Sequence, residues 1–266
     1  MTNSIKWRSE LKKKPKRLVI KLGSSAVTRD GGGVDFDKLH NILADVSYLL
    51  NQGVQVVIVS SGAIHTGRAF LKTRKNEISM LQALSAVGQP MLMSAYHDFF
   101  AKRGFQCAQI LLTHEDFRSS LRYKNARNTL NRLLENFVVP VLNENDTVSY
   151  SEITVGDNDQ LAALTCKMTQ PDVLVILTGT DGLCDRDPKK KGATIIPSVK
   201  HGEKLKGVLV SGRSAMGRGG MKTKLEAIRK TTGMRIPVIL SNYRHKSPVL
   251  EALTRDAGTF FEGKKK

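Results

Sequence analysis

The segment VVPVLNENDTVSYSEITVGDNDQLAAL, residues 138–164, indicates how this chain folds. It opens with a short apolar run typical of a buried strand, passes through a polar loop, and resumes as an apolar helical pattern from Leu161. The loop carries five carboxylates, at Glu144, Asp146, Glu152, Asp157 and Asp159. A strand, an acidic loop and a helix start in this order are typical of open α/β sheets, which bind ligands beyond the carboxyl ends of their strands.

The acidic loop is notable because the chain as a whole is strongly basic. The formal net charge is +18 and the pI is about 10.0. Carboxylate and amide groups gathered in one loop suit an ammonium group or a metal–phosphate ligand. The loop taken alone is equally compatible with a solvated connection that has ordinary turn chemistry.

Composition limits the classes of protein to consider. With 266 residues, 40% of them hydrophobic, the chain can form one good-sized α/β domain or two small ones. The longest apolar runs, such as 54–59 and 173–177, are strand-sized and too short to span a bilayer. The N-terminus lacks the apolar stretch of a secretion signal, and Cys107, Cys166 and Cys184 have no paired spacing. We therefore expect a reduced, cytoplasmic protein with no membrane partner.

The basic charge raises the alternative of a nucleic-acid partner. Part of the excess lies in residues 12–17 and 264–266, which we expect to be solvated, and in the cluster 189–191. No aromatic residues interleave with these clusters, so the stacking surface that binds single strands is missing. A basic surface also concentrates nucleotides and acidic metabolites. Nucleic acid therefore remains a minor alternative.

Strand-like and helix-like segments alternate along the chain. The expected strands are 17–22, 54–59, 107–113, 138–142, 173–177 and 237–240. The expected helices are 35–50, 80–103 with an interruption near Pro90, 125–136, 221–230 and 248–253. This alternation predicts an α/β protein with a mostly parallel central sheet and helices on both faces, a three-layer α-β-α sandwich.

Two strand ends carry residues suited to an anion. Lys21 lies in an apolar strand, where its ammonium group is costly unless it meets an anion at the strand end. Gly23 and Ser24 follow at once and offer backbone N–H and hydroxyl donors to a phosphate; the alternative is a lysine that extends to solvent at a strand edge. Ser61 follows the strand 54–59 at a second such junction, which suits a carboxylate or phosphate.

The segment SGRSAMGRGGMKTK, residues 211–224, combines glycines with lysines. Lys222 and Lys224 fall within the first turns of the helix expected from Met221. Cations at a helix N-terminus oppose the helix dipole, so a bound polyphosphate would explain them. The alternative is a flexible basic loop without a ligand.

Segments from Arg17 to Phe261 resemble, in the same order, the amino acid kinase family. They are RLVIKLGSSAVT, VVIVSSGAIHTGR, LQALSAVGQ, ILLTHEDF, NARNTL, VPVLNENDTVSYSEITVGDNDQLAALTC, VLVILTGTDGLCDRDP and GRGGMKTKLEA. The NEND…VGDND loop is the most specific of these, and within the family it resembles the glutamate 5-kinases. Kinases of the same family for aspartate, N-acetylglutamate, carbamate or UMP lack this loop in this form.

The resemblance implies the amino acid kinase fold and an activity. The activity is ATP-dependent phosphorylation of the γ-carboxylate of L-glutamate to glutamyl 5-phosphate, the first step of proline synthesis, with Mg²⁺. It also implies a homo-oligomer, dimer or tetramer, with proline as a possible feedback inhibitor. We expect a basic flexible extension at 1–16, a single kinase domain at 17–262 with acceptor and nucleotide halves, and a tail at 263–266.

The resemblance also implies roles for individual residues. Lys21 and Lys224 would contact the phosphoryl group in flight, and Asp159 would orient them. Glutamate would be bound by Ser61, Asp146, Asn158 and Asp157, with Asp146 on the ammonium group and Asp157 alternatively on magnesium. No metal ligand is assigned beyond this. The expected nucleotide-binding residues are Lys21, Gly23, Ser24, Thr178, Gly179, Arg218, Gly219, Gly220, Met221, Lys222, Thr223 and Lys224.

The chain departs from the family pattern in its nucleotide half. Gly179 replaces a frequent aspartate, so Asp181 is the expected substitute, while Cys184 replaces a tyrosine and Arg218 a threonine. The segment 241–250, SNYRHKSPVL, also differs. The given sequence ends near Lys266, whereas many relatives add an RNA-binding-like PUA domain. The sequence therefore leaves open which oligomer forms and whether proline inhibits the protein.

Two other functions remain open from sequence. One is another acyl-phosphate kinase of the same family, acting on N-acetylglutamate or aspartate. The other is a basic binding protein without catalysis, whose affinity for nucleic acid would fall steeply with salt. Retention of Lys21, Lys224 and Asp159 argues against the second.

Overall fold

We describe the protein from a computed structural model. The structure describes residues 7–11, 13–73, 75–148, 158–187, 191–203, 205, 220–255 and 257–265.

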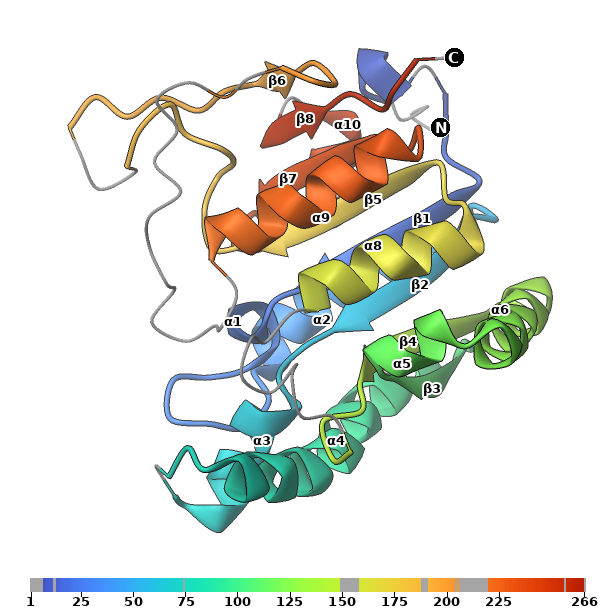
Figure 1. The fold of residues 1–266 in the computed structure, drawn as a ribbon, viewed down its shortest axis with the longest axis vertical. Helices are drawn as coiled ribbons and strands as arrows, with labels where there is room; N and C mark the ends of the chain where they lie inside the picture. Colours follow the sequence, from blue (N-terminus) through green and yellow to red (C-terminus); the bar gives the residue numbers. More distant parts are fainter. Residues whose placement is uncertain are drawn as a thin grey trace.

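An eight-stranded sheet forms the middle layer of the molecule, with helices on both of its faces (Figure 1). The strand order is β3-β4-β2-β1-β5-β7-β8-β6. The strands are β1 Arg17–Leu22, β2 Gln55–Ser60, β3 Gln106–Leu112, β4 Val138–Glu144, β5 Val173–Thr178, β6 Ser198–Val199, β7 Val238–Asn242 and β8 Thr259–Phe261. All neighbouring pairs run parallel except β7 with β8, which is antiparallel. The predicted fold class is confirmed.

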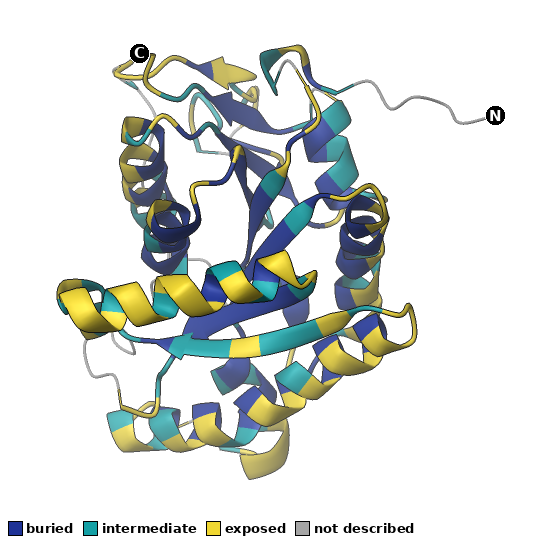
Figure 2. Ribbon diagram, turned by 90° about the vertical axis from the view of Figure 1, so that its right-hand side faces the viewer, coloured by how far each residue is buried: buried dark blue, intermediate teal, exposed yellow. Residues whose placement is uncertain are grey.

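The helices follow the predicted alternation closely. They are the 3₁₀ turn Ser9–Leu11, α1 Ser24–Val27, α2 Phe36–Asn51, α3 Ala63–Leu71, α4 Ile78–Ala101, α5 His114–Arg118, α6 Ser120–Glu135, α8 Asn158–Thr169, α9 Met221–Gly233 and α10 Pro248–Thr254. One hydrophobic cluster joins α2, α4 and α10 to one face of the sheet, and a second joins α6, α8 and α9 to the other. Buried residues fill the central strands, whereas the edge strand β3 carries exposed and half-buried ones (Figure 2).

The strand period decides which layer each side chain of β1 enters. Leu18, Ile20 and Leu22 belong to the cluster under α2, α4 and α10, whereas Val19 belongs to the cluster under α8 and α9. Successive side chains of a strand point to opposite faces. Lys21 is therefore directed, like Val19, toward the layer that contains α8 and α9.

Helix α4 runs without a break through Pro90, so the predicted interruption there is wrong. Pro90 and Ala86, the residue four positions earlier, are both exposed, which lets the carbonyl freed by proline face water. Gly88 allows α4 to pack closely against α3, because a Cβ at this position would lie 1.9 Å from the carbonyl oxygen of Ala63. Among the described helices, none is long and apolar enough to cross a membrane.

Part of the expected N-terminal extension packs on the domain. Trp7 is half-buried against the cluster under α2, α4 and α10. Arg8 is buried, and its backbone N–H donates to the carbonyl oxygen of Leu253 at 2.9 Å while its guanidinium donates to that of Ala257 at 2.9 Å. The division of the chain into extension, domain and tail otherwise stays a prediction.

A buried carboxylate on α2 makes the stability of the fold depend on pH. Asp45 accepts from the backbone N–H groups of Val249 (2.9 Å) and Leu250 (3.1 Å) at the start of α10. Burial raises the pKa of Asp45 from 3.8 to about 6, with the nearby Glu251 adding to the rise and the two backbone donors opposing it. The folded state therefore holds the proton more tightly than the unfolded chain does.

We expect Asp45→Asn to remove this pH dependence. The protonated carboxyl contributes about 3 kcal/mol of stability below pH 4, which is lost as the pH rises to about 6. Urea unfolding of both proteins from pH 4 to 7.5 measures it: wild type should lose stability relative to the asparagine variant across this window. A constant difference would show that Asp45 titrates alike in the folded and unfolded states.

Candidate active site

Two lysines that lie far apart in the sequence meet at one carboxylate. The ammonium of Lys21 is 2.6 Å from Oδ1 of Asp159, and the ammonium of Lys224 is 3.1 Å from Oδ2. The side chains of Lys21, Lys224 and Asp159 are 6%, 11% and 2% exposed, respectively. We call these three residues the lysine–aspartate cluster. It forms a buried group of two positive charges and one negative charge.

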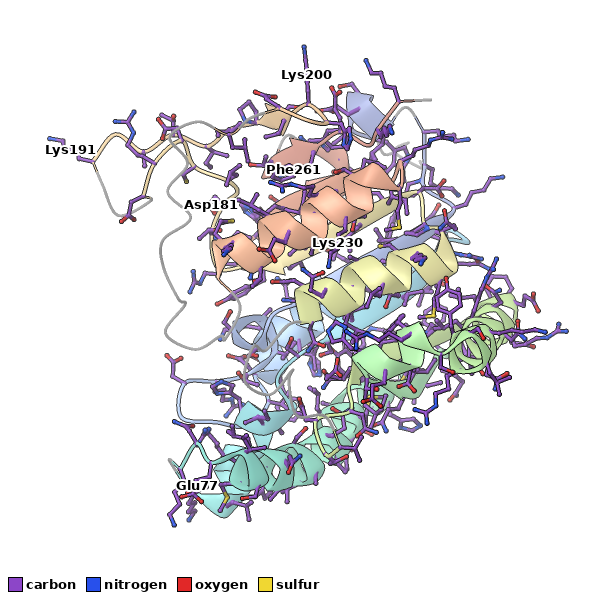
Figure 3. All side chains as sticks on the ribbon, viewed as in Figure 1. Glu77, Asp181, Lys191, Lys200, Lys230 and Phe261 are labelled. Carbon is purple, nitrogen blue, oxygen red and sulfur yellow. The ribbon has the colours of Figure 1, made fainter. Side chains whose placement is uncertain are left out.

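Each member of the cluster is placed by a different element. Lys21 is the penultimate residue of β1, Asp159 the second residue of α8, and Lys224 lies in the first turn of α9. Helices α8 and α9 lie side by side on the same face of the sheet (Figure 1). The ammonium of Lys230 on α9, labelled in Figure 3, donates a hydrogen bond to the side chain of Gln160 on α8. The cluster therefore sits at the carboxyl end of β1, where two helices also begin.

The electrostatics of the cluster favour an added anion. Burial alone would raise the pKa of Asp159, but the Coulomb attraction and hydrogen bonds of Lys21 and Lys224 outweigh it and hold that pKa below its usual value. The carboxylate is thus ionised and balances one ammonium group. One positive charge of the cluster stays unbalanced within it, which a phosphoryl group could neutralise.

The predicted phosphate-binding residues Gly23, Ser24 and those at the start of α9 lie beside the cluster in the sequence. A Cβ added at Gly23, directly after β1, would lie 3.9 Å from the ammonium of Lys21 and 3.9 Å from the carbonyl oxygen of Leu177. Gly220 precedes α9, where Thr223 donates to its carbonyl at 2.9 Å and to Asp159 at 3.3 Å. Ser24 starts α1 beside Gly23, and Met221 and Lys222 complete the first turn of α9.

Two of the predicted acceptor residues, Asn158 and Ser61, meet next to the cluster, and a third, Asp146, is bonded to α4. Asn158, the residue before Asp159, donates from Nδ2 to the hydroxyl of Ser61 at 2.8 Å, to Oδ1 of Asn143 at 2.9 Å and to the carbonyl of Ser60 at 3.2 Å. The carboxylate of half-buried Asp146, just beyond β4, accepts from the hydroxyl of Ser85 at 2.9 Å. The ends of β2 and β4 are thereby tied to the start of α8.

The predicted nucleotide residues at the end of β5 contact the segment after β7. The carbonyl of Thr178 accepts from the backbone N–H of Tyr243 at 3.0 Å, and that of Gly179 accepts from the guanidinium of Arg244 at 3.1 Å. Asp181, the expected substitute for the missing aspartate, accepts from the side chain of Asn242 at 2.7 Å. Three of the predicted residues, Asp157, Arg218 and Gly219, lie outside the described residues.

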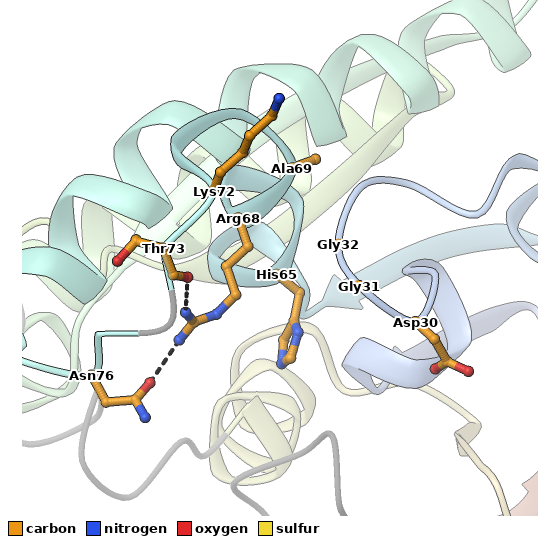
Figure 4. Close-up of a pocket in the computed structure, with 9 residues that line it drawn as sticks. All are labelled: Asp30, Gly31, Gly32, His65, Arg68, Ala69, Lys72, Thr73 and Asn76. Atoms are coloured by element: carbon orange, nitrogen blue, oxygen red, sulfur yellow. Dashed lines mark hydrogen bonds between the residues drawn. The ribbon is translucent and has the colours of Figure 1, made fainter.

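A hollow of about 840 Å³ lies along α3, which begins two residues after Ser61 (Figure 4). It is lined by Asp30, Gly31, Gly32, His65, Arg68, Ala69, Lys72, Thr73 and Asn76. The guanidinium of Arg68 donates to the carbonyl of Thr73 at 2.7 Å and to the side chain of Asn76 at 2.7 Å. Arg68 thus secures the turn that follows α3.

The described residues contain no group of three or more His, Cys, Asp or Glu side chains that could hold a metal ion. The carboxylate in the cluster is already used by two ammonium groups. Mg²⁺ commonly keeps several waters and is held by one or two carboxylates together with substrate phosphates.

A family model and several curated relatives match the sequence of this chain. Residues 16–242 match the model of the amino acid kinase family. The chain belongs to the amino acid kinase family. A glutamate 5-kinase of Burkholderia thailandensis is 43% identical over 246 residues, which cover 91% of this chain and 66% of that protein. One of Alkaliphilus oremlandii is 38% identical over 252 residues, covering 93% and 96%. This amino acid kinase therefore spans about two thirds of the first relative and nearly all of the second.

Two solved structures of other kinases share the fold. A UMP kinase from Bacillus anthracis has a TM-score of 0.63 at 15% identity and covers 95% of this chain and 98% of its own. An isopentenyl phosphate kinase from T. acidophilum has a TM-score of 0.66 at 18% identity, covering 92% and 100%. At these identities the likeness extends to the architecture alone.

Sequence reasoning missed a set of buried polar residues that support the acceptor side, by which we mean Ser61, Asp146 and Asn158 with the strand ends beside them. The set consists of Asn143 on β4 and of Ser85, Gln89 and Tyr96 on α4, which hydrogen-bond to these residues, to Ser60 or to one another. The segment LQALSAVGQ contains two of them, but we assigned it no role. A signal was present, because polar residues at positions i, i+4 and i+11 share one side of a helix.

Proposed function

We propose that this chain transfers the γ-phosphoryl group of ATP to the γ-carboxylate of L-glutamate and forms glutamyl 5-phosphate. The observation that carries the proposal is the convergence of Lys21 and Lys224 on Asp159, next to Asn158 and Ser61. A site of this kind can hold two anions together, which is what transfer between ATP and a carboxylate requires. The names of the relatives support glutamate as the acceptor.

The proposed reaction needs positioning more than covalent help. The γ-carboxylate is already a nucleophile, so it attacks the γ-phosphorus without a general base, and ADP leaves with the bridging oxygen. Lys21 and Lys224 neutralise the charge on the equatorial oxygens, and Asp159 fixes both ammonium groups. Magnesium, bound through the nucleotide phosphates, would supply further charge neutralisation.

We place the two substrates on opposite sides of the lysine–aspartate cluster. Ser61, Asn158 and Asp146 would bind glutamate, with the carboxylate of Asp146 on the substrate ammonium. Gly23, Ser24 and the start of α9 would bind the phosphates, and the ends of β5 and β7 the rest of the nucleotide. Homo-oligomer formation, inhibition by proline and a cytoplasmic location remain predictions.

A hydroxamate assay tests the proposed function. Hydroxylamine traps an acyl phosphate, so hydroxamate should form only when ATP, Mg²⁺ and glutamate are all present. Turnover with N-acetylglutamate or aspartate in place of glutamate would favour another kinase of the family. No turnover with any of the three acceptors, together with nucleic-acid affinity that falls steeply with salt, would favour a basic binding protein.

We expect Asp146→Ala to raise the KM for glutamate by about ten- to a hundredfold, because it removes a charge-assisted hydrogen bond to the substrate ammonium. The KM for ATP should change little. Steady-state kinetics with each substrate varied in turn measures both values. Asp98→Ala, an exposed acid on α4, is the control and should match wild type. An effect confined to ATP would show that the acceptor pocket is misplaced.

A further inference from the structure

Four side-chain amides form a continuous hydrogen-bonded chain from the edge of the sheet to the acceptor side. Gln89 donates to Gln109 at 3.1 Å, Asn143 donates to Gln89 at 2.8 Å, and Asn158 donates to Asn143 at 2.9 Å. Gln109 lies on the edge strand β3 and is exposed, whereas Gln89 and Asn143 are buried. We call these four residues the amide chain. Within the chain, Asn158, Asn143 and Gln89 each donate toward the edge of the sheet, and Gln109 accepts at its end.

Backbone groups fix this direction at two points. The backbone N–H of Glu144 can only donate, and it contacts Oδ1 of Asn143 at 2.9 Å. The other end of that amide must therefore be Nδ2, and Gln89 must offer Oε1 to it. Likewise the carbonyl of Ser60 can only accept, so the atom of Asn158 that faces it at 3.2 Å is Nδ2.

The consequence appears at the last amide. The NH₂ group of Asn158 is used on Ser60, Ser61 and Asn143, while its Oδ1 is buried and lacks a hydrogen-bond partner within the described part of the chain. A buried carbonyl oxygen without a partner is costly. A substrate group that donates a hydrogen bond, such as an ammonium, would satisfy it.

Three residues on one side of helix α4 hydrogen-bond to residues of the acceptor side. Ser85, Gln89 and Tyr96 share one side of the helix and are 4%, 7% and 0% exposed. Ser85 holds Asp146, Gln89 holds Asn143, and the hydroxyl of Tyr96 donates to that of Ser60 at 2.8 Å. Gln89 is the member that connects to Asn158, through Asn143.

We propose that Gln89 is a positioning residue that sets the preference of this site for an acceptor with a free amino group. It accepts from Nδ2 of Asn143 and so holds that side chain in place, with Oδ1 of Asn143 on Asn158 and Oδ1 of Asn158 available to the substrate ammonium. The inference rests on the proposed function. It assigns a role in acceptor binding to Gln89, a residue that does not contact the substrate itself. Without the acceptor on Gln89, the buried NH₂ group of Asn143 loses its partner. Asn143 is then no longer held in place against Asn158, and Oδ1 of Asn158 is no longer held in place for the substrate ammonium.

The test compares glutamate with glutarate, which has both carboxylates but no amino group, in the hydroxamate assay. Gln89→Met keeps the length of the side chain and removes its acceptor. We expect it to raise the KM for glutamate about tenfold or more, with kcat and the KM for ATP unchanged. Turnover of glutarate should stay at its wild-type level, so the preference for glutamate falls by the same factor.

Two further variants separate positioning from simple packing. Gln89→Glu can still accept from Asn143, while exposed Gln109 can turn its NH₂ toward the new carboxylate, so the KM for glutamate should stay within about threefold of wild type. Gln82→Met makes the same change earlier on α4 at a half-buried position and should have no effect. If Gln89→Met does not fold, Gln89→Leu takes its place.

The outcomes are distinct. An unchanged KM for glutamate in Gln89→Met, or an equal loss with glutamate and glutarate, would overturn the positioning role while the proposed function stands. Absence of glutamate turnover in the wild-type protein would overturn the proposed function, and the role of Gln89 with it.

Discussion

Replacing Lys224 with alanine should lower kcat by about a hundred- to a thousandfold, the usual effect of removing one group that stabilises transition-state charge. The ammonium of Lys224 sits 3.1 Å from Asp159 at the start of α9, where the proposed phosphoryl group passes. The fold should survive, because Lys21 remains paired with Asp159 and the buried charges then cancel. Loss of kcat without loss of stability is thus the expected result.

Arg229→Ala provides the matched control for Lys224→Ala. Arg229 is an exposed cation further along α9, so its loss changes the net charge equally without reaching the cluster. Steady-state kinetics and urea unfolding of the three proteins measure both effects. Near-normal turnover in Lys224→Ala would contradict the role assigned to this residue. If Lys224→Ala does not fold, Lys224→Arg tests the catalytic role instead, because it retains the charge but alters its reach.

The sequence showed why the two lysines need an anion, and the family resemblance supplied Asp159. A lysine in a buried strand and a lysine at a helix start are costly without a negative charge nearby, and from the residues alone we expected that charge to be a phosphate. That Asp159 orients Lys21 and Lys224 followed from the resemblance to the amino acid kinases. The structure brings the three residues together, and their catalytic roles stay predictions.

Other features depend on packing that no local pattern reveals. Pro90 predicted an interruption of α4, yet the helix is continuous because Pro90 lies on its exposed side. The residues of α4 that hold the acceptor side face β2 and β4, and this contact depends on how α4 crosses the sheet. Spacing showed that Ser85 and Gln89 share a side of the helix, but not that this side meets Asp146 and Asn143.

Asp159→Asn removes the negative charge of the cluster, whereas Lys224→Ala removes one of its positive charges. We expect Asp159→Asn to damage both the fold and the activity. It leaves two buried ammonium groups, on Lys21 and Lys224, with no carboxylate between them. Removing one partner of a buried ion pair typically costs about 3–5 kcal/mol because the remaining charge is uncompensated. We therefore expect a large drop in the free energy of unfolding, together with a loss of turnover of at least about a hundredfold because neither lysine is held in place.

An added anion distinguishes this electrostatic explanation from a packing defect. Inorganic phosphate or ATP can neutralise the two ammonium groups, so either should raise the melting temperature of Asp159→Asn more than that of wild type. Asp172→Asn is the control, since exposed Asp172 accepts only from the backbone N–H groups of Lys16 and Arg17 at the opposite end of β1 among the bonds of the described residues. Equal stabilisation of all three proteins by phosphate would contradict the electrostatic explanation, because a packing defect in Asp159→Asn would gain nothing from an anion beyond what wild type gains.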